Sequence, residues 1–418
     1  MKDWKELVLE EIDKNQEELI QLCSKLLQFP NENPPGDSRP ISQFIMNYLK
    51  ESGISVTVHP GNETMLNLVS TLGNPGDKHL LYCGHTDVVP AGDLSRWEIP
   101  PFSGLVKDGY INGRGASDMK GGVAGLLFTV ALFARLRIPL AGQLSLLLVA
   151  DEETGGEFGV PWVLDQGLIT GTAALIAEPS SRLNPTIGQK GSCWLEFTVK
   201  GVPGHGSLSP LNGDSAIVKA CKGIQALQKL WELKPDIPEE EQRIINITKK
   251  YIREREPKDL SDIIDHVSVN IGTIQGGTKV NMVADGCTVQ VDSRVPFGLD
   301  YTEVLAEANR LLREAGIETA VKPFGFYGNA NWTSDNDEIV DLVVKNIAKV
   351  TQEDAYGVLQ WASSDARYFR MHGIPVLQYG PAELSGIHSF NERVPIQNLI
   401  ESAKVYALTA LEYLRTIK

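Results

Sequence analysis

The chain has 418 residues, of which 42% are hydrophobic and 22% are charged, and its formal net charge is −14 at pH 7. This length is sufficient for two domains with separate cores. The negative charge argues against nucleic acid or an anionic membrane as the main partner, because both repel an acidic surface. A small-molecule substrate remains open, because local fields decide its binding.

Cysteine usage points to a reducing compartment. The five cysteines are odd in number, widely spaced and without a CxxC pair, so neither a disulfide framework nor a thiolate zinc site is expected. Residues 1–6 open a charged amphipathic helix rather than a signal peptide. No uninterrupted apolar run approaches the length needed to span a bilayer. We therefore expect a cytoplasmic protein with no membrane partner.

The first part of the chain reads as α/β. Apolar residues at helical spacing predict helices over 4–28 and 41–49, separated by a breaker cluster at 31–36. Short alternating stretches predict strands, and near-continuous apolar runs predict buried strands of a parallel sheet. The predicted strands are 55–59, 66–70, 79–84, 143–150 and 173–177, with an apolar helix over 123–136.

From residue 186 the strands alternate apolar and polar residues, as expected for a sheet with one wet face. The predicted order of strand, helix, two strands, helix and strand is that of a ferredoxin-like split βαβ domain. Its elements are 194–200, 215–230, 267–274, 288–295, 302–314 and 319–322, and 234–265 reads as a solvated insertion with some helix. After residue 326 the α/β pattern returns, with a helix over 337–350, a strand over 374–379 and a closing helix from Pro395.

We therefore predict an α/β fold with a mixed, mostly parallel sheet flanked by helices. A ferredoxin-like α+β domain is inserted into it. The predicted boundaries are 1–186 and 326–418 for the first domain and 187–325 for the inserted one.

The buried strand at 79–84 ends abruptly at Gly84 and is followed by His85 and Asp87. In an open α/β sheet, ligands bind beyond the carboxyl ends of the strands. There a metal ion can reach the imidazole of His85, while Asp87 orients the ring from behind. The alternative is a strand end with two solvated polar residues.

Acidic residues follow the other core elements in the same way. Asp118 stands after a glycine-rich approach at the mouth of a long apolar helix, where a helix N-cap is the alternative. Glu152 and Glu153 follow one apolar strand, and Glu178 follows the next. Adjacent carboxylates repel one another and are costly to desolvate unless cations compensate them, although in a solvated loop they would be harmless.

His388 follows the last predicted strand by several residues and completes this set. Two histidines and three carboxylates suit one or a pair of Zn²⁺, Co²⁺ or Mn²⁺ ions. Ca²⁺ fits less well, because it takes only oxygen ligands.

Several motifs, taken in their order along the chain, resemble those of the M20 metallopeptidase family. That family includes acetylornithine deacetylase, succinyl-diaminopimelate desuccinylase, aminoacylase 1 and carboxypeptidase G2. The matching stretches are HTDVVP at 85–90, GRGASDMKGG at 113–122, DEETG at 151–155, AEP at 177–179, GHGS at 204–207 and HSFNE at 388–392. The resemblance covers nearly the whole chain and implies a zinc-peptidase-like fold with an inserted lid.

The resemblance implies a site for two divalent metal ions, with zinc as the first expectation and cobalt or manganese as alternatives. Asp118 would bridge the two ions. His85 and Glu178 would complete one site, and Glu153 and His388 the other. In this family the peptide bond after Asp118 is often cis.

The resemblance also implies catalytic and substrate-binding roles. Glu152 would be the general base, and Asp87 would hold the metal-binding imidazole. His205 would reach the active site of a partner subunit as an oxyanion donor, assisted by Asn281. From its glycine loop alone, His205 reads as an exposed turn histidine. Arg294 lies on the wet face of a strand, where it either clamps a substrate carboxylate or forms a surface salt bridge.

The function implied is that of a dinuclear metal-dependent amidohydrolase. It would remove an N-acyl group from a small substrate with a free carboxylate, such as an N-acyl amino acid. A metallo-carboxypeptidase or dipeptidase acting on short peptides is the alternative, and a non-catalytic binding protein on this scaffold is the rival from another class. Residues 1–186 and 326–418 would form the catalytic metal-binding domain, and 187–325 a lid through which a homodimer forms.

Overall fold

The computed structural model describes residues 4–255 and 258–417. The chain divides into two compact units. The larger unit comprises Met1–Ile187, Thr333–Gly357 and Ser364–Lys418, and the smaller unit comprises Gly188–Trp332 and Val358–Ser363. The main segment of the smaller unit therefore ends at residue 332, whereas the expected boundary was 325. The unit also includes residues 358–363, which the sequence did not place there. The roles expected of the two domains stay predictions.

A mixed sheet forms the centre of the larger unit, with strand order β1-β2-β6-β3-β7-β15 and β8 beside β15. β3 runs parallel to both of its neighbours, β6 and β7, whereas β1 and β2 form an antiparallel edge. The strands are β1 (Thr57–Pro60), β2 (Leu66–Gly73), β3 (His79–His85), β6 (Gln143–Val149), β7 (Ala173–Ile176), β8 (Thr186–Gln189) and β15 (Val376–Gln378). The predicted α/β fold with a mixed sheet, parallel at its centre, is confirmed.

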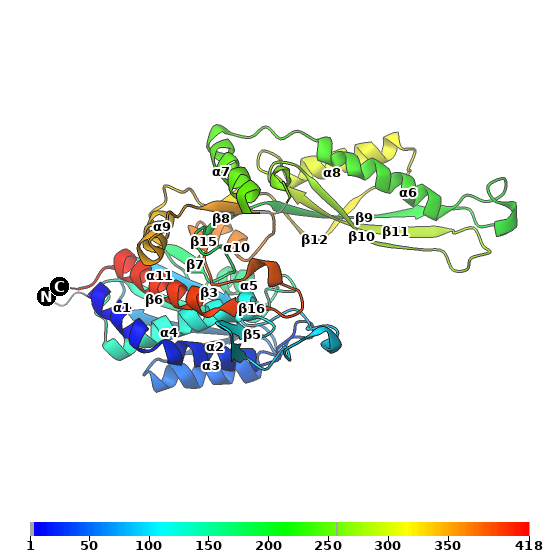
Figure 1. The fold of residues 1–418 in the computed structure, drawn as a ribbon. Coiled ribbons are helices and arrows are strands. Elements are labelled where there is room, and N and C mark those ends of the chain that lie inside the picture. Colours follow the sequence, from blue (N-terminus) through cyan, green and yellow to red (C-terminus); the bar gives the residue numbers. More distant parts are fainter. Residues whose placement is uncertain (1–3, 256–257, 418) are drawn as a thin grey trace. The chain divides into compact units, whose positions relative to one another are not determined.

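Helices cover this sheet (Figure 1). They are α1 (Trp4–Lys14), α2 (Gln16–Leu27), α3 (Arg39–Glu51), α4 (Gly121–Leu136), α5 (Val160–Asp165), α9 (Glu338–Thr351), α10 (Ala366–Met371) and α11 (Ile396–Leu414). α4 and α11 pack on each other and on β3 and β6. The single helix predicted over 4–28 is two helices that meet at Asn15. The side-chain amide of Asn15 donates to the backbone carbonyl of Glu11, a local bond that competes with helix continuation.

α4 is apolar on every side, and its residues from Gly121 to Phe133 are buried, as expected for a core helix. Together with the turn before it, the segment Ala116–Leu136 is long and apolar enough to cross a membrane, which differs from the expectation that no such run exists. However, 83% of its most apolar window is buried within the protein. All five cysteines are free, in line with the expected absence of a disulfide framework. The cytoplasmic location stays a prediction.

A small antiparallel sheet, ordered β16-β5-β4, lies beside the start of α4. Its strands are β4 (Leu105–Lys107), β5 (Tyr110–Asn112) and β16 (Arg393–Pro395). Each has only three residues, too few for a periodic pattern, so the sequence did not predict them. By pairing β5 with β16, this sheet joins the segment before Asp118 to the segment after His388.

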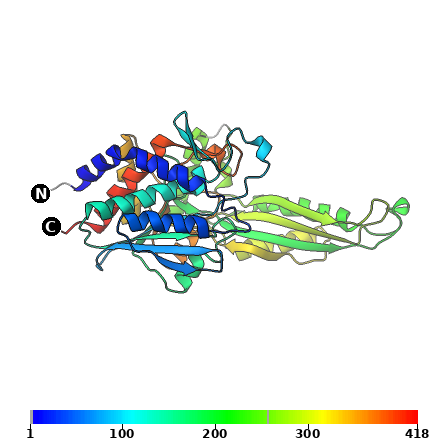
Figure 2. The ribbon, with the colours of Figure 1, turned by 90° about the horizontal axis from the view of Figure 1, so that it is seen from below.

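The smaller unit contains an antiparallel sheet with order β10-β11-β9-β12. α6 and α8 lie on one face of this sheet (Figures 1 and 2). The elements run β9 (Gly191–Lys200), α6 (Ala216–Leu227), β10 (Ser268–Gly276), β11 (Gly286–Val295), α8 (Tyr301–Glu314) and β12 (Lys322–Gly328), with α7 (Glu239–Arg255) between α6 and β10 and the short strands β13 (Asn331–Trp332) and β14 (Val358–Gln360). The ferredoxin-like order is as predicted, and β12 begins where the predicted strand at 319–322 ends.

Alternate residues of β9 and β11 form the core of the smaller unit. Leu195, Phe197, Val289 and Val291 are buried against α6 and α8, and the residues between them face the other side. An Asp300–Glu303 capping box begins α8. The alternating pattern in the sequence therefore corresponds to one buried and one wetter face.

A close backbone approach joins α4 to the end of β7. A β-carbon at Gly122 would lie 2.1 Å from the carbonyl oxygen of Ala177, directly before Glu178. Only glycine permits this separation, and it brings the turn that carries Asp118 next to the end of β7.

We therefore expect Gly122→Ala to lower the free energy of unfolding by about 1–3 kcal/mol, because backbone must move to accommodate the methyl group. Thermal unfolding of the purified protein measures the effect as a lower midpoint. Gly286→Ala is the matched control, because no atom lies within 4 Å of its β-carbon position. Equal midpoints for the two variants would contradict the close-approach argument.

Candidate functional site

Three neighbouring parallel strands end at the same edge of the larger unit's sheet, and polar residues follow each of them. β3 ends at His85, which pairs with Val149 of β6. Glu152 and Glu153 come shortly after β6, and Glu178 comes two residues after β7. Because these strands are parallel and in register, their ends meet. The edge therefore gathers an imidazole and several carboxylates.

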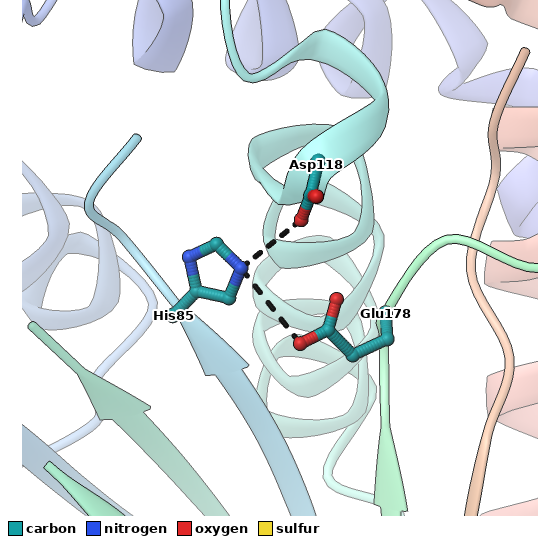
Figure 3. Close-up of side chains that lie close together, drawn as sticks. All are labelled: His85, Asp118 and Glu178. Carbon is teal, nitrogen blue, oxygen red and sulfur yellow. Dashed lines mark hydrogen bonds and ion pairs between the residues drawn. The ribbon is translucent and has the colours of Figure 1, made fainter. Parts of the chain in front are cut away.

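His85, Asp118 and Glu178 form a first cluster (Figure 3). Nε2 of His85 lies 3.1 Å from Oδ1 of Asp118 and 3.8 Å from Oε1 of Glu178. The three potential ligand atoms lie within 4.8 Å of one another. His85 is only 2% exposed, so the alternative of a solvated strand end is wrong. The structure brings together the residues expected in one metal site.

Asp118, Glu153 and His388 form a second cluster. Nε2 of His388 lies 3.2 Å from Oδ2 of Asp118 and 3.3 Å from Oε1 of Glu153. The two oxygens of Asp118 thus serve different clusters, as a bridging carboxylate would. The side chain of His388 is 50% exposed, and its φ of 56° places it in the left-handed region, where histidine is more frequent than most residues.

Buried hydrogen bonds to Glu392 fix the backbone at Asp118. The carboxylate of Glu392 accepts N–H groups from Ser117 and Asp118 at 3.0 and 3.1 Å and pairs with Nη1 of Arg114 at 2.6 Å. The peptide bond between Asp118 and Met119 is cis. The N-cap position of α4 is occupied by Lys120, so the alternative of Asp118 as a helix cap is wrong. Instead, Asp118 is an acid in the turn that precedes the helix.

Asp87 connects His85 to the acidic loop after β6. Nδ1 of His85 lies 3.4 Å from a carboxylate oxygen of Asp87 and 3.0 Å from its backbone oxygen. The same carboxylate accepts the backbone N–H groups of Glu152 and Glu153 at 3.3 and 3.2 Å. This geometry fits the expected orienting role, because one residue fixes both the imidazole and the loop.

Burial raises the pKa of the glutamates at this edge. The pKa of Glu152 and that of Glu178 lie well above the ordinary value, and the pKa of Glu153 is also raised; neighbouring carboxylates add to the effect of burial in each case. Burial acts in the same direction on Asp118, but hydrogen bonds to the two imidazoles outweigh it and hold the pKa of Asp118 below its usual range. The ionised carboxylates at this edge are therefore destabilised unless positive charge lies beside them.

The pKa of both imidazoles is raised as well, which for an imidazole favours the charged form. Hydrogen bonds to Asp118 and Glu153 raise the pKa of His388 to about 10. Burial alone would lower the pKa of His85, but its hydrogen bonds to Asp118 and Asp87 outweigh burial and raise that pKa well above the ordinary value. Two imidazolium ions can thus partly neutralise the carboxylates, and they must lose their protons before they can bind a metal.

The donor set fits divalent metal ions. Each cluster offers one imidazole nitrogen and two carboxylate oxygens, the mixture that Zn²⁺, Co²⁺ and Mn²⁺ accept. A cation at either place would offset both the burial of the glutamates and the repulsion from neighbouring carboxylates, the two effects that raise their pKa. The two clusters are therefore candidate metal sites that share one carboxylate.

Among the described residues, Glu152 lies in neither cluster. Its side chain is partly buried, and its pKa is raised first by burial and then by the charge of Glu178. A carboxyl group with a raised pKa that is not committed to a metal is suited to accept and return a proton.

The other predicted site residues lie in the smaller unit. His205 and Asn281 are exposed and adjacent there: His205 bridges to Met282, and the N–H of Gly206 donates to the carbonyl of Asn281. Nδ1 of His205 accepts the backbone N–H of Ser207 at 3.3 Å and lies 2.7 Å from the hydroxyl oxygen of Ser207. Their expected roles stay predictions.

Arg294 already has an ion-pair partner. Its Nε and Nη2 contact the two carboxylate oxygens of Asp292 at 2.8 and 3.0 Å. Its Nη1 donates to the hydroxyls of Ser192 and Ser363 at 3.2 and 3.3 Å. The salt bridge considered as an alternative is therefore present, and it holds the guanidinium in one orientation.

Sequence reasoning gave no role to several buried polar residues at this edge. Asn33 and Asp151 contact each other beside Asp87, and Arg114 pairs with Glu392. Asp365 is 3% exposed, and burial raises its pKa to about 6. These residues belong to loops without periodicity, so only the fold reveals their partners. Arg114, Asp151 and Glu392 did lie within recognised motifs, which was the one available signal.

A sequence model described as peptidase family M20/M25/M40 matches residues 81–412. An N-formyl-4-amino-5-aminomethyl-2-methylpyrimidine deformylase of Halalkalibacterium halodurans is 27% identical over an alignment that covers 96% of this chain and 95% of the relative.

Solved structures of other proteins resemble the fold. Human carnosine dipeptidase 1 superposes with a TM-score of 0.79 at 18% identity, covering 99% of each chain. The Bacillus subtilis YXEP protein, described as a dinuclear metal-binding peptidase, superposes with a TM-score of 0.67 at 16% identity, covering 97% of this chain and all of the other. At these identities the likeness is one of fold.

Proposed function

The chain belongs to peptidase family M20/M25/M40, and from this premise we propose that it is a dinuclear metal-dependent amidohydrolase that deacylates a small N-acyl substrate. The observation that carries the proposal is the pair of imidazole–carboxylate clusters that share Asp118, beside a glutamate outside both. A non-catalytic protein on this scaffold would not need all of these groups together, because the crowded acids are costly.

Two divalent ions would be held by the clusters, one by His85, Asp118 and Glu178 and the other by Asp118, Glu153 and His388. Zinc is the first expectation, and cobalt or manganese would also suit these donors. When bound, the ions supply Lewis-acid polarisation of the amide carbonyl and activation of water. Asp87 keeps Nδ1 of His85 engaged, so that Nε2 faces the cluster.

Glu152 is proposed as the general base. It takes a proton from the water that attacks the amide carbonyl and returns the proton to the leaving nitrogen, so that the carboxyl ends each cycle as it began. The contact between the N–H of Glu152 and the carboxylate of Asp87 fixes its backbone. Burial, which raises its pKa, brings its proton affinity closer to that of the groups it serves.

Glu152→Gln is expected to lower kcat by about 100- to 10,000-fold, because the amide cannot carry the proton. Elemental analysis should still find two metal ions per chain. Glu157→Gln, an exposed acid in the same loop, is the matched control and should retain full activity. Full activity of Glu152→Gln would refute the assigned base, and loss of metal would make Glu152 a ligand instead.

Deacylation is preferred over peptide cleavage because a relative that aligns over nearly its full length is a deformylase. A metallo-carboxypeptidase or dipeptidase remains the alternative, in view of the dipeptidase that shares the fold. The zinc- or cobalt-loaded protein should hydrolyse members of a panel of N-formyl, N-acetyl and N-succinyl amino acids, and a chelator should abolish this activity. Faster cleavage of dipeptides or of C-terminal residues would favour the alternative.

Arg294 is proposed to recognise the carboxylate of the substrate. Asp292, Ser192 and Ser363 hold its guanidinium in place, so the group is ordered before substrate arrives. Because Asp292 also offsets much of its charge, a neutral substrate is the competing possibility. The N-formylaminomethylpyrimidine named for the relative is such a compound.

Matched substrates separate these possibilities. If Arg294 binds a carboxylate, wild-type kcat/KM should be about 10- to 100-fold higher for an N-acyl amino acid than for its primary amide, and Arg294→Gln should remove that preference. Arg310→Gln, which alters an exposed ion pair of the same unit, should leave the preference unchanged. A wild-type enzyme that prefers the neutral amide would reject the role of Arg294 but not deacylation itself.

A homodimer through the smaller unit is proposed as well. β10 is an edge strand of its sheet and is exposed along most of its length. Large apolar side chains of the same unit are also exposed, namely Val202, Leu211, Ile274, Val280 and Met282. An open strand edge beside apolar surface suits a two-fold contact. His205 would then donate to the oxyanion in the active site of the partner subunit.

Mixing two inactive variants tests this role. His205→Ala should lower kcat by about 100- to 1000-fold, as expected for loss of an oxyanion donor. If His205 acts in trans, an equimolar mixture of His205→Ala and Glu152→Gln that exchanges subunits should regain about one quarter of wild-type activity. Half of the dimers would then be mixed, each with one intact site. No recovery in mixed dimers, or a fully active monomer in sedimentation, would contradict the proposal.

A further inference from the structure

The breaker cluster at 31–36, which separates the first helices, lies along the loop after β3. The N–H of Asn33 donates to the carbonyl of Val88 at 2.8 Å, and the N–H of Val88 donates to the carbonyl of Asn31 at 3.3 Å. Glu32 and Val88 form a parallel bridge. This segment is therefore fastened to the loop that contains Asp87, although it lies outside the matched residues 81–412.

The side chain of Asn33 extends this attachment to the acidic edge. Its Nδ2 donates to a carboxylate oxygen of Asp87 at 2.9 Å and to one of Asp151 at 3.0 Å, and it lies 3.1 Å from the hydroxyl oxygen of Thr154. Oxygen acceptors surround this atom, so the donor end of the amide must face them. Asn33 is 3% exposed, and water does not compete for these bonds.

Two carboxylates come close to each other at this point. Asp87 is 1% exposed and Asp151 is 2% exposed, so neither charge is well solvated. An amide between them donates to both and adds no charge of its own. Without it, both carboxylates would be left with an unfilled acceptor and with their mutual repulsion. The expected response is movement of one of the two segments that carry them.

Either movement would reach the candidate metal ligands. Asp87 contacts Nδ1 of His85, and its carboxylate also holds the N–H groups of Glu152 and Glu153. Asp151 directly precedes those two glutamates and accepts the N–H of Phe158 at the far end of the loop. The amide of Asn33 is thus linked through one carboxylate to the imidazole and through the other to the loop that carries Glu153.

We propose that Asn33 is a positioning residue for the metal centre. Its amide fixes Asp87 relative to Asp151, and through them it fixes His85 relative to Glu153, one ligand from each cluster. The proposal rests on the proposed metal-dependent function. A purely structural role for Asn33 would instead affect the stability of the metal-free protein and leave metal affinity alone.

The test compares metal affinity with stability. Zn²⁺ affinity is measured by competition with a chromophoric chelator for Asn33→Ala and Asn33→Asp, alongside thermal unfolding of the metal-free proteins and kcat and KM. Asn33→Ala should weaken Zn²⁺ binding by about 10- to 100-fold, the usual effect of removing a residue that orients a ligand. Asn33→Asp keeps the shape but places oxygen against two carboxylates, so its loss should be at least as large. For both variants kcat should fall more than KM rises.

Asn346→Ala is the matched control, because Asn346 is 1% exposed and its amide also donates to a carboxylate, that of Glu412, at 3.0 Å. Its Zn²⁺ affinity should stay within about twofold of wild type even if its unfolding midpoint falls. Wild-type Zn²⁺ affinity in either folded Asn33 variant would overturn the proposal. If wild-type protein binds Zn²⁺ but hydrolyses no N-acyl substrate, the proposed function fails, and the affinity comparison still decides the role of Asn33.

Discussion

The crowding of buried carboxylates at one edge of a parallel sheet is the constraint on which the rest of the larger unit depends. Burial raises the pKa of Glu153 and that of Glu178, and repulsion from neighbouring carboxylates raises them further. Two imidazoles from separate parts of the chain, His85 after β3 and His388 in the loop before β16, supply the opposing charge. Asp118 lies between them and is the one acid of the two clusters whose pKa is lowered. The edge is therefore built to hold positive charge.

Two acids outside the clusters accept hydrogen bonds from the backbone beside the candidate ligands. Glu392 accepts two N–H groups at Ser117 and Asp118, and Asp87 accepts two at Glu152 and Glu153. A carboxylate that accepts backbone N–H groups keeps its charge at lower cost and also fixes the direction in which the neighbouring side chains project. The candidate ligands are thus oriented by a second set of acids, which are themselves satisfied by Arg114 and Asn33.

The parts of this arrangement that the sequence predicts are those with a local signature. Apolar runs that stop at polar residues predicted β3, β6 and β7 together with His85, Glu153 and Glu178, because parallel strands bring their carboxyl ends to one edge. His388 was included because it follows the last predicted strand, and the structure places it farther along, in the loop before β16. Asn33 and Asp365 were not predicted because each interacts with residues far away along the chain, Asn33 with Asp87 and Asp151 and Asp365 with His85. Short strands such as β5 were not predicted, because three residues are too few to show an alternating pattern.

The adjacent residues Glu152 and Glu153 show why the backbone decides the chemistry. A carboxylate bound to a cation has its lone pairs engaged and its pKa lowered, so it is a poor carrier of protons. A base therefore has to stand beside the metal ligands without being one of them. The loop after β6 meets this requirement with consecutive residues: Glu153 contacts His388, whereas Glu152 lies in neither cluster described for the chain. Because Asp87 holds the N–H groups of both, the same interaction that sets the position of the ligand sets that of the proposed base.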